Sequence, residues 1–281
     1  MLLTSYDHSR AAAGLTYVYP VVSRRAGGVS VGINLNPNNA CNWRCVYCQV
    51  PDLVRGSAPA VDMGRLEDEL RGLLQDILQG DFMARRVAPE ARRLSDIALS
   101  GNGEPTSAQE FDEVVDLLGK VMAEFDLTGK IKLVLITNGS LIRRQAVQQG
   151  LRRMAALNGE VWFKLDSATE AGRRRINGTR MAMARVRENA ALAASLCPTW
   201  LQTCMFAWDG QAPSEAEQQA YLACVTELRR QPAPLRGVLL YSLARPSMQA
   251  EAPHLSALEP DWMESFAAKI ERLGVPVKLS L

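Results

Sequence analysis

The chain has 281 residues, of which 47% are hydrophobic and 22% are charged, and its formal net charge is +2. This composition is that of an ordinary globular protein, and the small net charge neither requires nor excludes an anionic partner such as a nucleic acid. The longest apolar runs are too short to cross a bilayer, and the first residues lack the basic and apolar segments of a signal peptide, so we expect a cytoplasmic protein without a membrane span.

Strand-like apolar runs alternate with helix-like stretches along the chain. The run at 29–36 is β-branched, and the stretch at 63–78 carries leucine and isoleucine at helical spacing. The further predicted strands span 95–101, 131–139, 159–167, 199–208, 236–244 and 275–281, and the further predicted helices span 108–125, 142–156, 180–195, 214–230 and 260–273. This alternation is typical of an α/β fold in which helices cover a parallel sheet.

No linker, low-complexity tract or charge block interrupts the alternation, so one domain is the simpler expectation. In parallel α/β folds, ligands bind beyond the carboxyl ends of the strands. Here that edge is formed by the loops after residues 36, 101, 139, 166, 207 and 244.

The loop after the first of these strands reads NNACNWRCVYCQ and holds Cys41, Cys45 and Cys48. Three closely spaced thiolates can hold three irons of a [4Fe–4S] cluster, and with no fourth cysteine nearby the last iron would be open to a small molecule. The alternatives are a zinc site and cysteines that are merely buried close together. Structural zinc requires four ligands, yet the only histidines, His8 and His254, are remote in sequence.

The other cysteines, Cys197, Cys204 and Cys224, are scattered. A chain of this length with ample apolar residues does not need disulfides to replace a core, so we expect reduced thiols. A lone cysteine on a strand is most often a small buried hydrophobic residue, and we expect this of all three.

The sequence CNWRCVYC resembles the C-x3-C-x2-C signature of the radical S-adenosylmethionine (SAM) superfamily, including an aromatic residue, Tyr47, before the last cysteine. Three further segments resemble that superfamily in the same order: LSGNGEPT, LITNGS and FKLDSATEAGRRRING. The last of these, together with LLYSLARP, is similar to the wyosine-synthase-like branch of tRNA-modifying Fe–S oxidoreductases. The resemblance covers residues 29–281.

The resemblance implies a partial (β/α)6 barrel of the TIM type, formed by residues 29–281, with 1–28 as an N-terminal extension packed on it. Cys41, Cys45 and Cys48 would bind the [4Fe–4S] cluster, and SAM would chelate the open iron. One electron from the cluster would cleave SAM into methionine and a 5′-deoxyadenosyl radical, which would abstract hydrogen from the substrate. The protein would position and shield these cofactors.

The resemblance also implies the residues that contact SAM. These are Tyr47, Gly101, Asn102, Gly103, Glu104, Thr137, Asn138, Lys164 and Asp166. The Glu104 carboxylate would accept hydrogen bonds from the SAM ammonium group, Lys164 would bind its carboxylate, and Asp166 would bind a ribose hydroxyl. Each also has a plain structural reading. The GNGE segment would be a turn with an acid favoured at the start of a helix, and Thr137 and Asn138 would be turn formers. Lys164 and Asp166 would pair across a strand end, and Tyr47 would pack within the loop.

Three further residues are candidates for contact with substrate. Cys204 could donate a hydrogen atom to a substrate radical, and Arg175 and Arg245 follow strands at the expected active-site edge. The arginine run at 173–175 is compatible with tRNA, although most basic pairs in the chain are expected to be solvated helix surfaces.

The chain departs from the resemblance at two points. Asn102 stands where many members of the superfamily have a second glycine. Wyosine synthases bind a second cluster through cysteines ahead of the main motif, whereas this chain has none before Cys41, which speaks against their pyruvate-dependent reaction.

We therefore expect a radical SAM enzyme with an unidentified substrate, reduced by a flavodoxin- or ferredoxin-type donor. The alternatives within the class are an activase for a glycyl radical enzyme and a peptide-modifying enzyme. The alternative outside the class is a non-catalytic module that binds an Fe–S cluster or another metal.

Overall fold

The computed structural model describes residues 2–3, 14–23 and 27–281. Much of the predicted N-terminal extension, 1–28, and His8 therefore lie outside the described residues. Within the described part, every helix is too short or too polar to cross a membrane.

The chain divides into two compact units that alternate along the sequence. Unit 1 comprises Met1–Cys41, Gly56–Ile136 and Arg144–Glu160, and unit 2 comprises Asn42–Arg55, Thr137–Arg143 and Val161–Leu281. Most of the cysteine loop thus belongs to unit 2, whereas the strand that leads into it belongs to unit 1.

Unit 1 is built on strands in the order β1-β2-β5-β6. Their bounds are β1 Val18–Ser23, β2 Gly28–Ile33, β5 Leu94–Leu99 and β6 Lys132–Thr137. β2, β5 and β6 are parallel, whereas β1 runs antiparallel to β2. The helices are α1 Met63–Leu78, α2 Phe82–Arg86, α3 Phe111–Glu124 and α4 Gln145–Ala156, and two 3-10 turns span Pro89–Ala91 and Pro105–Ser107.

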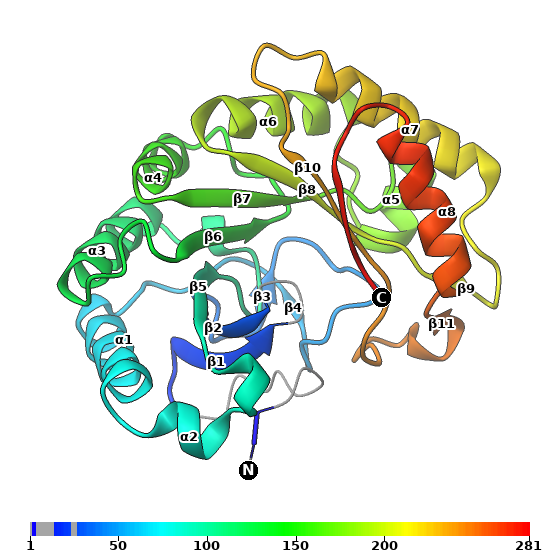
Figure 1. The fold of residues 1–281 in the computed structure, drawn as a ribbon. Helices are drawn as coiled ribbons and strands as arrows, with labels where there is room; N and C mark the ends of the chain where they lie inside the picture. Colours follow the sequence, from blue (N-terminus) through cyan, green and yellow to red (C-terminus); the bar gives the residue numbers. More distant parts are fainter. Residues whose placement is uncertain (1, 4–13, 24–26) are drawn as a thin grey trace. The chain divides into compact units, whose positions relative to one another are not determined.

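The helices of unit 1 pack through apolar stripes. In α1, Leu66, Leu70 and Leu74 recur at helical spacing and are completely buried, and α3 contributes a similar buried stripe. Figure 1 shows α1, α3 and α4 next to one another along the strands of this unit. Asp62 begins α1 by accepting the Arg65 amide, as an N-cap residue does.

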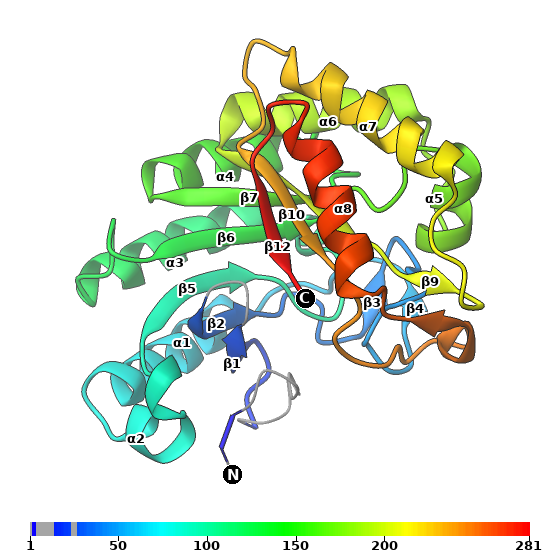
Figure 2. The ribbon, with the colours of Figure 1, turned by 45° about the vertical axis from the view of Figure 1, so that its right-hand side comes forward.

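Unit 2 is built on the parallel strands β7, β8, β10 and β12, in that order. Their bounds are β7 Gly159–Lys164, β8 Thr199–Cys204, β10 Gly237–Tyr241 and β12 Val277–Ser280. The helices are α5 Glu170–Asn177, α6 Met183–Leu196, α7 Glu215–Arg229 and α8 Pro260–Glu271. Figure 2 shows α6, α7 and α8 beside β8 and β10.

Short strands complete the structure. β9 Ala207–Trp208 pairs antiparallel with β11 Leu255–Ser256, next to a 3-10 turn at Ala252–His254. β3 Ala40–Cys41 and β4 Val54–Arg55 stand before and after the cysteine loop in the chain.

The predicted class, an α/β fold with parallel strands, is confirmed. The helix expected at 63–78 is α1 to the residue, and the other expected helices and strands are present with shifted ends. β1 and α5 are additional elements: β1 adds an antiparallel strand within the predicted extension, and α5 stands between β7 and α6. The single-domain boundaries stay a prediction.

Candidate active site

The three clustered cysteines lie on one loop that begins at β3. Cys41 ends β3, and Cys45 and Cys48 follow in unit 2, where the Cys48 amide donates to the Cys45 carbonyl at 3.0 Å. All six cysteines are free thiols; the clustered three are half-buried, and the other three are buried, as expected for small hydrophobic residues.

The C-terminal turn of α5 holds this loop. The amides of Arg44 and Val46 donate to the carbonyls of Asn177 and Ile176 at 3.2 and 2.8 Å. Since the last carbonyls of a helix have no partner within it, they are ready acceptors for another segment. Gly178 caps α5 in the left-handed conformation, with φ +62°, and its carbonyl accepts from the Arg55 guanidinium at 2.7 Å.

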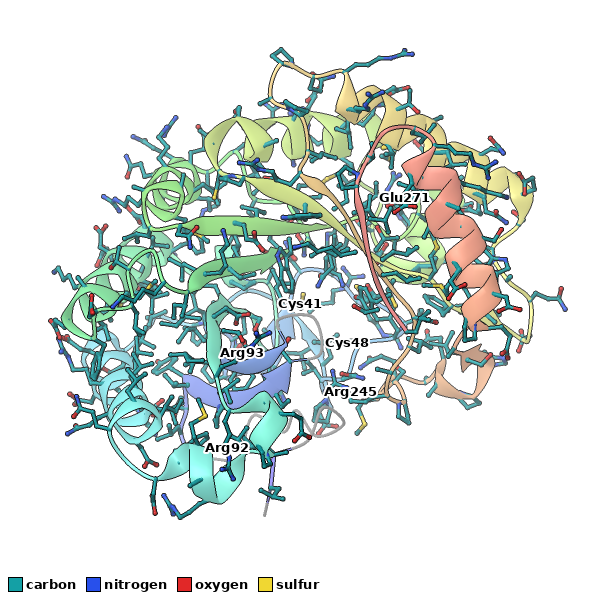
Figure 3. All side chains as sticks on the ribbon, in the orientation of Figure 1. Cys41, Cys48, Arg92, Arg93, Arg245 and Glu271 are labelled. Carbon is teal, nitrogen blue, oxygen red and sulfur yellow. The ribbon has the colours of Figure 1, made fainter. Side chains whose placement is uncertain are left out.

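The segment after β10 holds the same loop through its carbonyls. The Ser247 hydroxyl donates to the carbonyl of Val46 at 2.7 Å, and the Met248 amide donates to that of Cys48 at 2.9 Å. The Gln249 amide group reaches the Val50 carbonyl at 2.9 Å. Figure 3 labels Cys48 and Arg245, the latter on the chain that leads from β10 into this segment.

Cys45 is the cysteine whose surroundings are best defined. The Asn177 amide nitrogen lies 3.3 Å from Cys45 Sγ, within hydrogen-bonding distance for sulfur. Burial raises the pKa of the Cys45 thiol to about 12, although the Lys164 ammonium and the Asn177 hydrogen bond act in the opposite direction. A bound iron would reverse this, because a coordinating thiol is deprotonated outright.

Tyr47, Asp166 and Cys204 meet where β7 and β8 end, and Cys204 is the last residue of β8. The Tyr47 hydroxyl donates to Asp166 Oδ2 at 2.5 Å, and the Cys204 amide donates to Oδ1 at 2.9 Å. Asp166 is 3% exposed, so its charge is compensated by donors rather than by water. The Cys204 side chain packs with Val46 and Phe206 in an apolar cluster, and its hydrogen-donor role stays a prediction.

Lys164 ends β7 beside this group. Its ammonium lies 4.8 Å from the centroid of the Tyr47 ring. Burial acts to lower the pKa of Lys164, but its electrostatic interactions with Tyr241 and Asp166 outweigh burial and raise the pKa above the ordinary value. Lys164 is therefore a cation at neutral pH, which suits it to bind a carboxylate and not to act as a nucleophile.

Thr137 is the last residue of β6, and Asn138, which follows it, contacts the start of the cysteine loop. The Asn138 amide nitrogen donates to Asn42 Oδ1 at 2.8 Å, and the Asn42 amide nitrogen donates to the Ser140 hydroxyl at 2.8 Å. The Thr137 hydroxyl accepts from the Gly139 amide at 3.0 Å. Thr137 and Asn138, which the sequence predicts as SAM contacts, are thus also the turn formers that their residue types indicate.

Within unit 1, the segment Gly101–Glu104 packs against the chain that leads from β2 to Cys41. Gly101 has φ +152°, and a Cβ on it would clash with Asn34. A Cβ on Gly103 would clash with the Ala40 carbonyl. Both glycines are therefore needed for a close approach of backbone to backbone.

The polar groups of this segment are anchored in unit 1. The Asn102 backbone donates to Asn34 Oδ1 at 3.0 Å, and its side-chain nitrogen donates to Asn39 Oδ1 at 2.6 Å. Glu104 is 3% exposed, and its Oε1 accepts from the Thr106 hydroxyl at 2.6 Å. Asn102 therefore replaces a second glycine with a side chain that ties this turn to the loop before Cys41.

Arg175 and Arg245 belong to unit 2. The Arg175 guanidinium lies 3.9 Å above the centroid of the Trp208 ring, and the His254 ring stacks on Trp208 at 6.1 Å. Arg175 is exposed, and Arg245 is half-buried near the segment that contacts the cysteine loop.

The three clustered cysteines suit a [4Fe–4S] cluster better than a single metal ion. Among the described residues, no three His, Cys, Asp or Glu side chains form a group suited to one metal ion. A [4Fe–4S] cluster gives each thiolate its own iron, so its ligands need not converge on one point. Three soft sulfur ligands on one short loop therefore fit such a cluster with one open iron.

Sequence reasoning missed four asparagines that build the site. Asn34 and Asn36 follow β2 and are 3% and 1% exposed, and Asn36 donates to the Ala40 carbonyl at 2.9 Å. Asn42 and Asn177 bond to side chains described above. For Asn34, Asn36 and Asn42 the repeated asparagines in NLNPNNACN are a local signal, because an amide can both donate and accept at a crowded turn. Asn177 lies in the segment FKLDSATEAGRRRING, whose resemblance does not reveal its contact with Cys45.

The comparisons with known proteins agree with these motifs. A family model described as "Radical SAM superfamily" matches residues 35–218. The chain is 32% identical over 162 residues to the UPF0026 protein slr1464 of Synechocystis sp., covering 57% of this chain and 52% of that protein. It is 30% identical over 158 residues to the UPF0026 protein MJ1312 of Methanocaldococcus jannaschii, covering 56% and 42%. The chain thus aligns to about half the length of these curated relatives.

A solved structure of TYW1 with a lysine-pyruvate adduct bound is similar in fold, with a TM-score of 0.57. Its sequence identity is 15%, and the match covers 88% of this chain and 74% of that chain. At this identity the likeness concerns the fold alone. It agrees with the predicted fold class, a partial (β/α)6 barrel.

Proposed function

The chain belongs to the radical SAM superfamily, and we propose that it is an enzyme of the wyosine-synthase-like branch whose cluster ligands are Cys41, Cys45 and Cys48. The observation that carries this proposal is the cysteine loop itself. It offers three free thiols, and its backbone is held by α5 and by the segment at 247–249. A loop fixed by other elements can present its ligands without first being ordered.

When bound, the [4Fe–4S] cluster supplies the electron that splits SAM into methionine and a 5′-deoxyadenosyl radical, which takes a hydrogen atom from the substrate. The residues of the chain bind, orient and shield these groups. Trp43, which is 5% exposed, and Val46, which is 2% exposed, contribute apolar bulk to the loop and help to exclude water.

Charged and polar residues hold SAM in this proposal. Lys164, protonated at neutral pH, binds the SAM carboxylate, and Glu104 accepts from its ammonium group. Thr106 orients the Glu104 carboxylate through its hydroxyl. Gly101 and Gly103 allow the backbone of this turn to approach its neighbours closely. Thr137 holds the turn after β6, and Asn138 keeps Asn42 in place beside Cys41.

The branch assignment rests on the segment FKLDSATEAGRRRING and on the fold likeness to TYW1. In this proposal, Arg174 and Arg175, exposed on the last turn of α5, contact the phosphates of an RNA substrate. A flavodoxin- or ferredoxin-type protein supplies the electron. The free thiols of all six cysteines suit a reducing compartment, and we place the protein in the cytoplasm.

The test is the cleavage of SAM by protein reconstituted anaerobically with iron and sulfide. With dithionite and SAM, the wild-type chain should yield 5′-deoxyadenosine, detected by chromatography. Cys45→Ala should lose both the brown chromophore and the product, whereas Cys224→Ala, a buried cysteine on α7, should keep both. An intact, reducible cluster that yields no product would instead support a non-catalytic Fe–S module.

A further inference from the structure

Asn177 is the last residue of α5 and is 1% exposed. Its side-chain nitrogen lies 2.7 Å from Asp166 Oδ2 and 3.3 Å from Cys45 Sγ. The same side-chain amide group therefore faces both the carboxylate and the sulfur.

The carboxylate of Asp166 settles which group of the Asn177 amide faces the sulfur. An ionised carboxylate only accepts hydrogen bonds, so the group that faces Asp166 must be the amide NH2 and not the amide oxygen. That NH2 has two hydrogens, one for Asp166 and one for Cys45 Sγ. Tyr47 and the Cys204 amide hold the carboxylate in turn, through hydrogen bonds of 2.5 and 2.9 Å.

The backbone of Asn177 reinforces this position. Its carbonyl accepts from the Arg44 amide at 3.2 Å, one residue before Cys45, and the neighbouring Ile176 carbonyl accepts from Val46, one residue after it. Cys45 is thus flanked by two contacts to α5. The side chain of Asn177 cannot move away from the sulfur without breaking the hydrogen bonds around it.

A hydrogen bond to a cluster sulfur favours the reduced cluster over the oxidised one. Reduction adds an electron that is shared with the thiolate sulfurs, and a donor aimed at such a sulfur stabilises the added negative charge more strongly than the smaller charge before reduction. In a half-buried site this stabilisation is only weakly screened by water. The loss of the donor should therefore make the cluster harder to reduce.

We propose that Asn177 is a positioning residue that donates a hydrogen bond to Cys45 Sγ and thereby raises the reduction potential of the cluster, with Asp166 and Tyr47 fixing its orientation. This inference rests on the proposed function, since it requires the cluster. It gives Asp166 a task in addition to the ribose contact expected from the sequence. Asp166 orients the Asn177 side chain so that its NH2 group, and not its carbonyl oxygen, faces Cys45.

The experiment is a redox titration of the reconstituted protein without SAM, followed by electron paramagnetic resonance of the reduced cluster. Asn177→Leu keeps the approximate volume but removes the donor, and its midpoint should be more negative than that of the wild type. A tenfold change in the ratio of reduced to oxidised cluster corresponds to a shift of about 59 mV for a one-electron couple. Asn177→Gln should restore part of the shift, because it keeps an amide.

The matched control is Gln219→Leu, which removes an amide that bonds to Glu215 on the exposed side of α7. It should leave the midpoint unchanged. Iron and sulfide contents are measured for every variant, so that potentials are compared only between fully loaded proteins. If Asn177→Leu does not hold a cluster, Asn177→Ser, whose hydroxyl is too short to reach the sulfur, is titrated in its place.

A midpoint equal to that of the wild type in a loaded Asn177→Leu or Asn177→Ser protein would overturn this inference and leave the proposed function standing. Loss of the cluster in both variants would also overturn it, because Asn177 would then serve assembly and not the potential. A wild-type protein that binds no cluster would overturn the proposed function itself.

Discussion

Arg44 and Glu251 form a two-pronged ion pair that joins the cysteine loop to the segment after β10. Arg44 Nη1 lies 2.6 Å from Glu251 Oε1, and Nη2 lies 2.9 Å from Oε2. Together with the hydrogen bonds of Ser247 and Met248, this pair fixes a second side of the loop whose first side is held by α5. The loop is thus held through its backbone and through the Arg44 side chain.

We expect Glu251→Ala to lower the free energy of unfolding by only about 0.2–1 kcal/mol, because both partners are partly exposed to water. The hydrogen bond from Arg44 lowers the pKa of Glu251, so its contribution is present above the ordinary glutamate pKa and is lost as the pH falls through the lowered one. Urea denaturation at low and high salt checks this. If the difference in unfolding free energy between the wild type and Glu251→Ala did not shrink at high salt, an electrostatic origin would be contradicted.

Glu69 joins the segment just before β1 to α1. We expect its replacement to lower the free energy of unfolding by more than Glu251→Ala does. Its carboxylate accepts from the amides of Tyr17 and Thr16 at 2.7 and 2.9 Å and from Arg65. Burial alone would raise the pKa of Glu69, but these donors outweigh it and lower the pKa. Glu69→Gln should therefore reduce the free energy of unfolding at pH 7 by about 1–3 kcal/mol.

The pH dependence follows from the sign of that shift. Because the pKa of Glu69 is lower in the folded chain than in the unfolded one, its contribution is complete above about pH 4.3, the ordinary glutamate value, and disappears as the pH falls through the folded pKa. The difference between wild type and Glu69→Gln should narrow accordingly in urea denaturation below pH 4. The control is Glu67→Gln, because Glu67 is half-exposed on the same helix. If Glu67→Gln and Glu69→Gln lowered the free energy of unfolding equally, this explanation would be contradicted.

Gly101→Ala tests the close approach in the GNGE turn. Gly101 has φ +152°, and Asn34 occupies the place that a Cβ would take. The alanine should therefore displace the turn and weaken the binding of SAM by the cluster-loaded protein. Gly72→Ala has open space around it in the exposed part of α1 and should be neutral or stabilise by about 0.5–1 kcal/mol. Equilibrium dialysis with SAM and thermal unfolding distinguish the two. Unchanged binding in Gly101→Ala would show that the turn is not needed for SAM.

Lys164→Met removes the cation that we assign to the SAM carboxylate. The loss of a hydrogen bond to a charged group costs about 1.5–3 kcal/mol, which corresponds to an increase in Kd of roughly tenfold to a hundredfold. Lys278→Met is a matched control, because Lys278 on β12 packs over the ring of Trp200 on β8. Equilibrium dialysis of cluster-loaded proteins measures both. Equal Kd values for the wild type and Lys164→Met would refute this assignment.

The sequence predicts the features that are encoded locally. Leu66, Leu70 and Leu74 repeat at helical spacing, so α1 is predicted to the residue. Three cysteines within eight positions mark the loop that we propose as the cluster loop without any structure. β1 is harder to predict because Pro20 lies within it, and a proline cannot donate to a sheet. α5 is short and mostly polar, so no apolar stripe marks it.

The roles of Asn34, Asn36 and Asn177 could not be predicted, because they depend on partners distant in the sequence. Asn177 lies 132 positions from Cys45, and Asn34 lies 68 positions from Asn102. An asparagine before a glycine reads locally as a helix end, which Asn177 also is. Only the fold shows that this helix end faces the cysteine loop.

The central claim is that the loop at 41–48 holds an Fe–S cluster with one iron open to SAM. The most direct measurement is electron paramagnetic resonance of the anaerobically reconstituted, dithionite-reduced chain before and after SAM is added. The account predicts a reduced [4Fe–4S] signal whose line shape changes on addition of SAM. Protein that carries only zinc, or a signal that is the same with and without SAM, would contradict it.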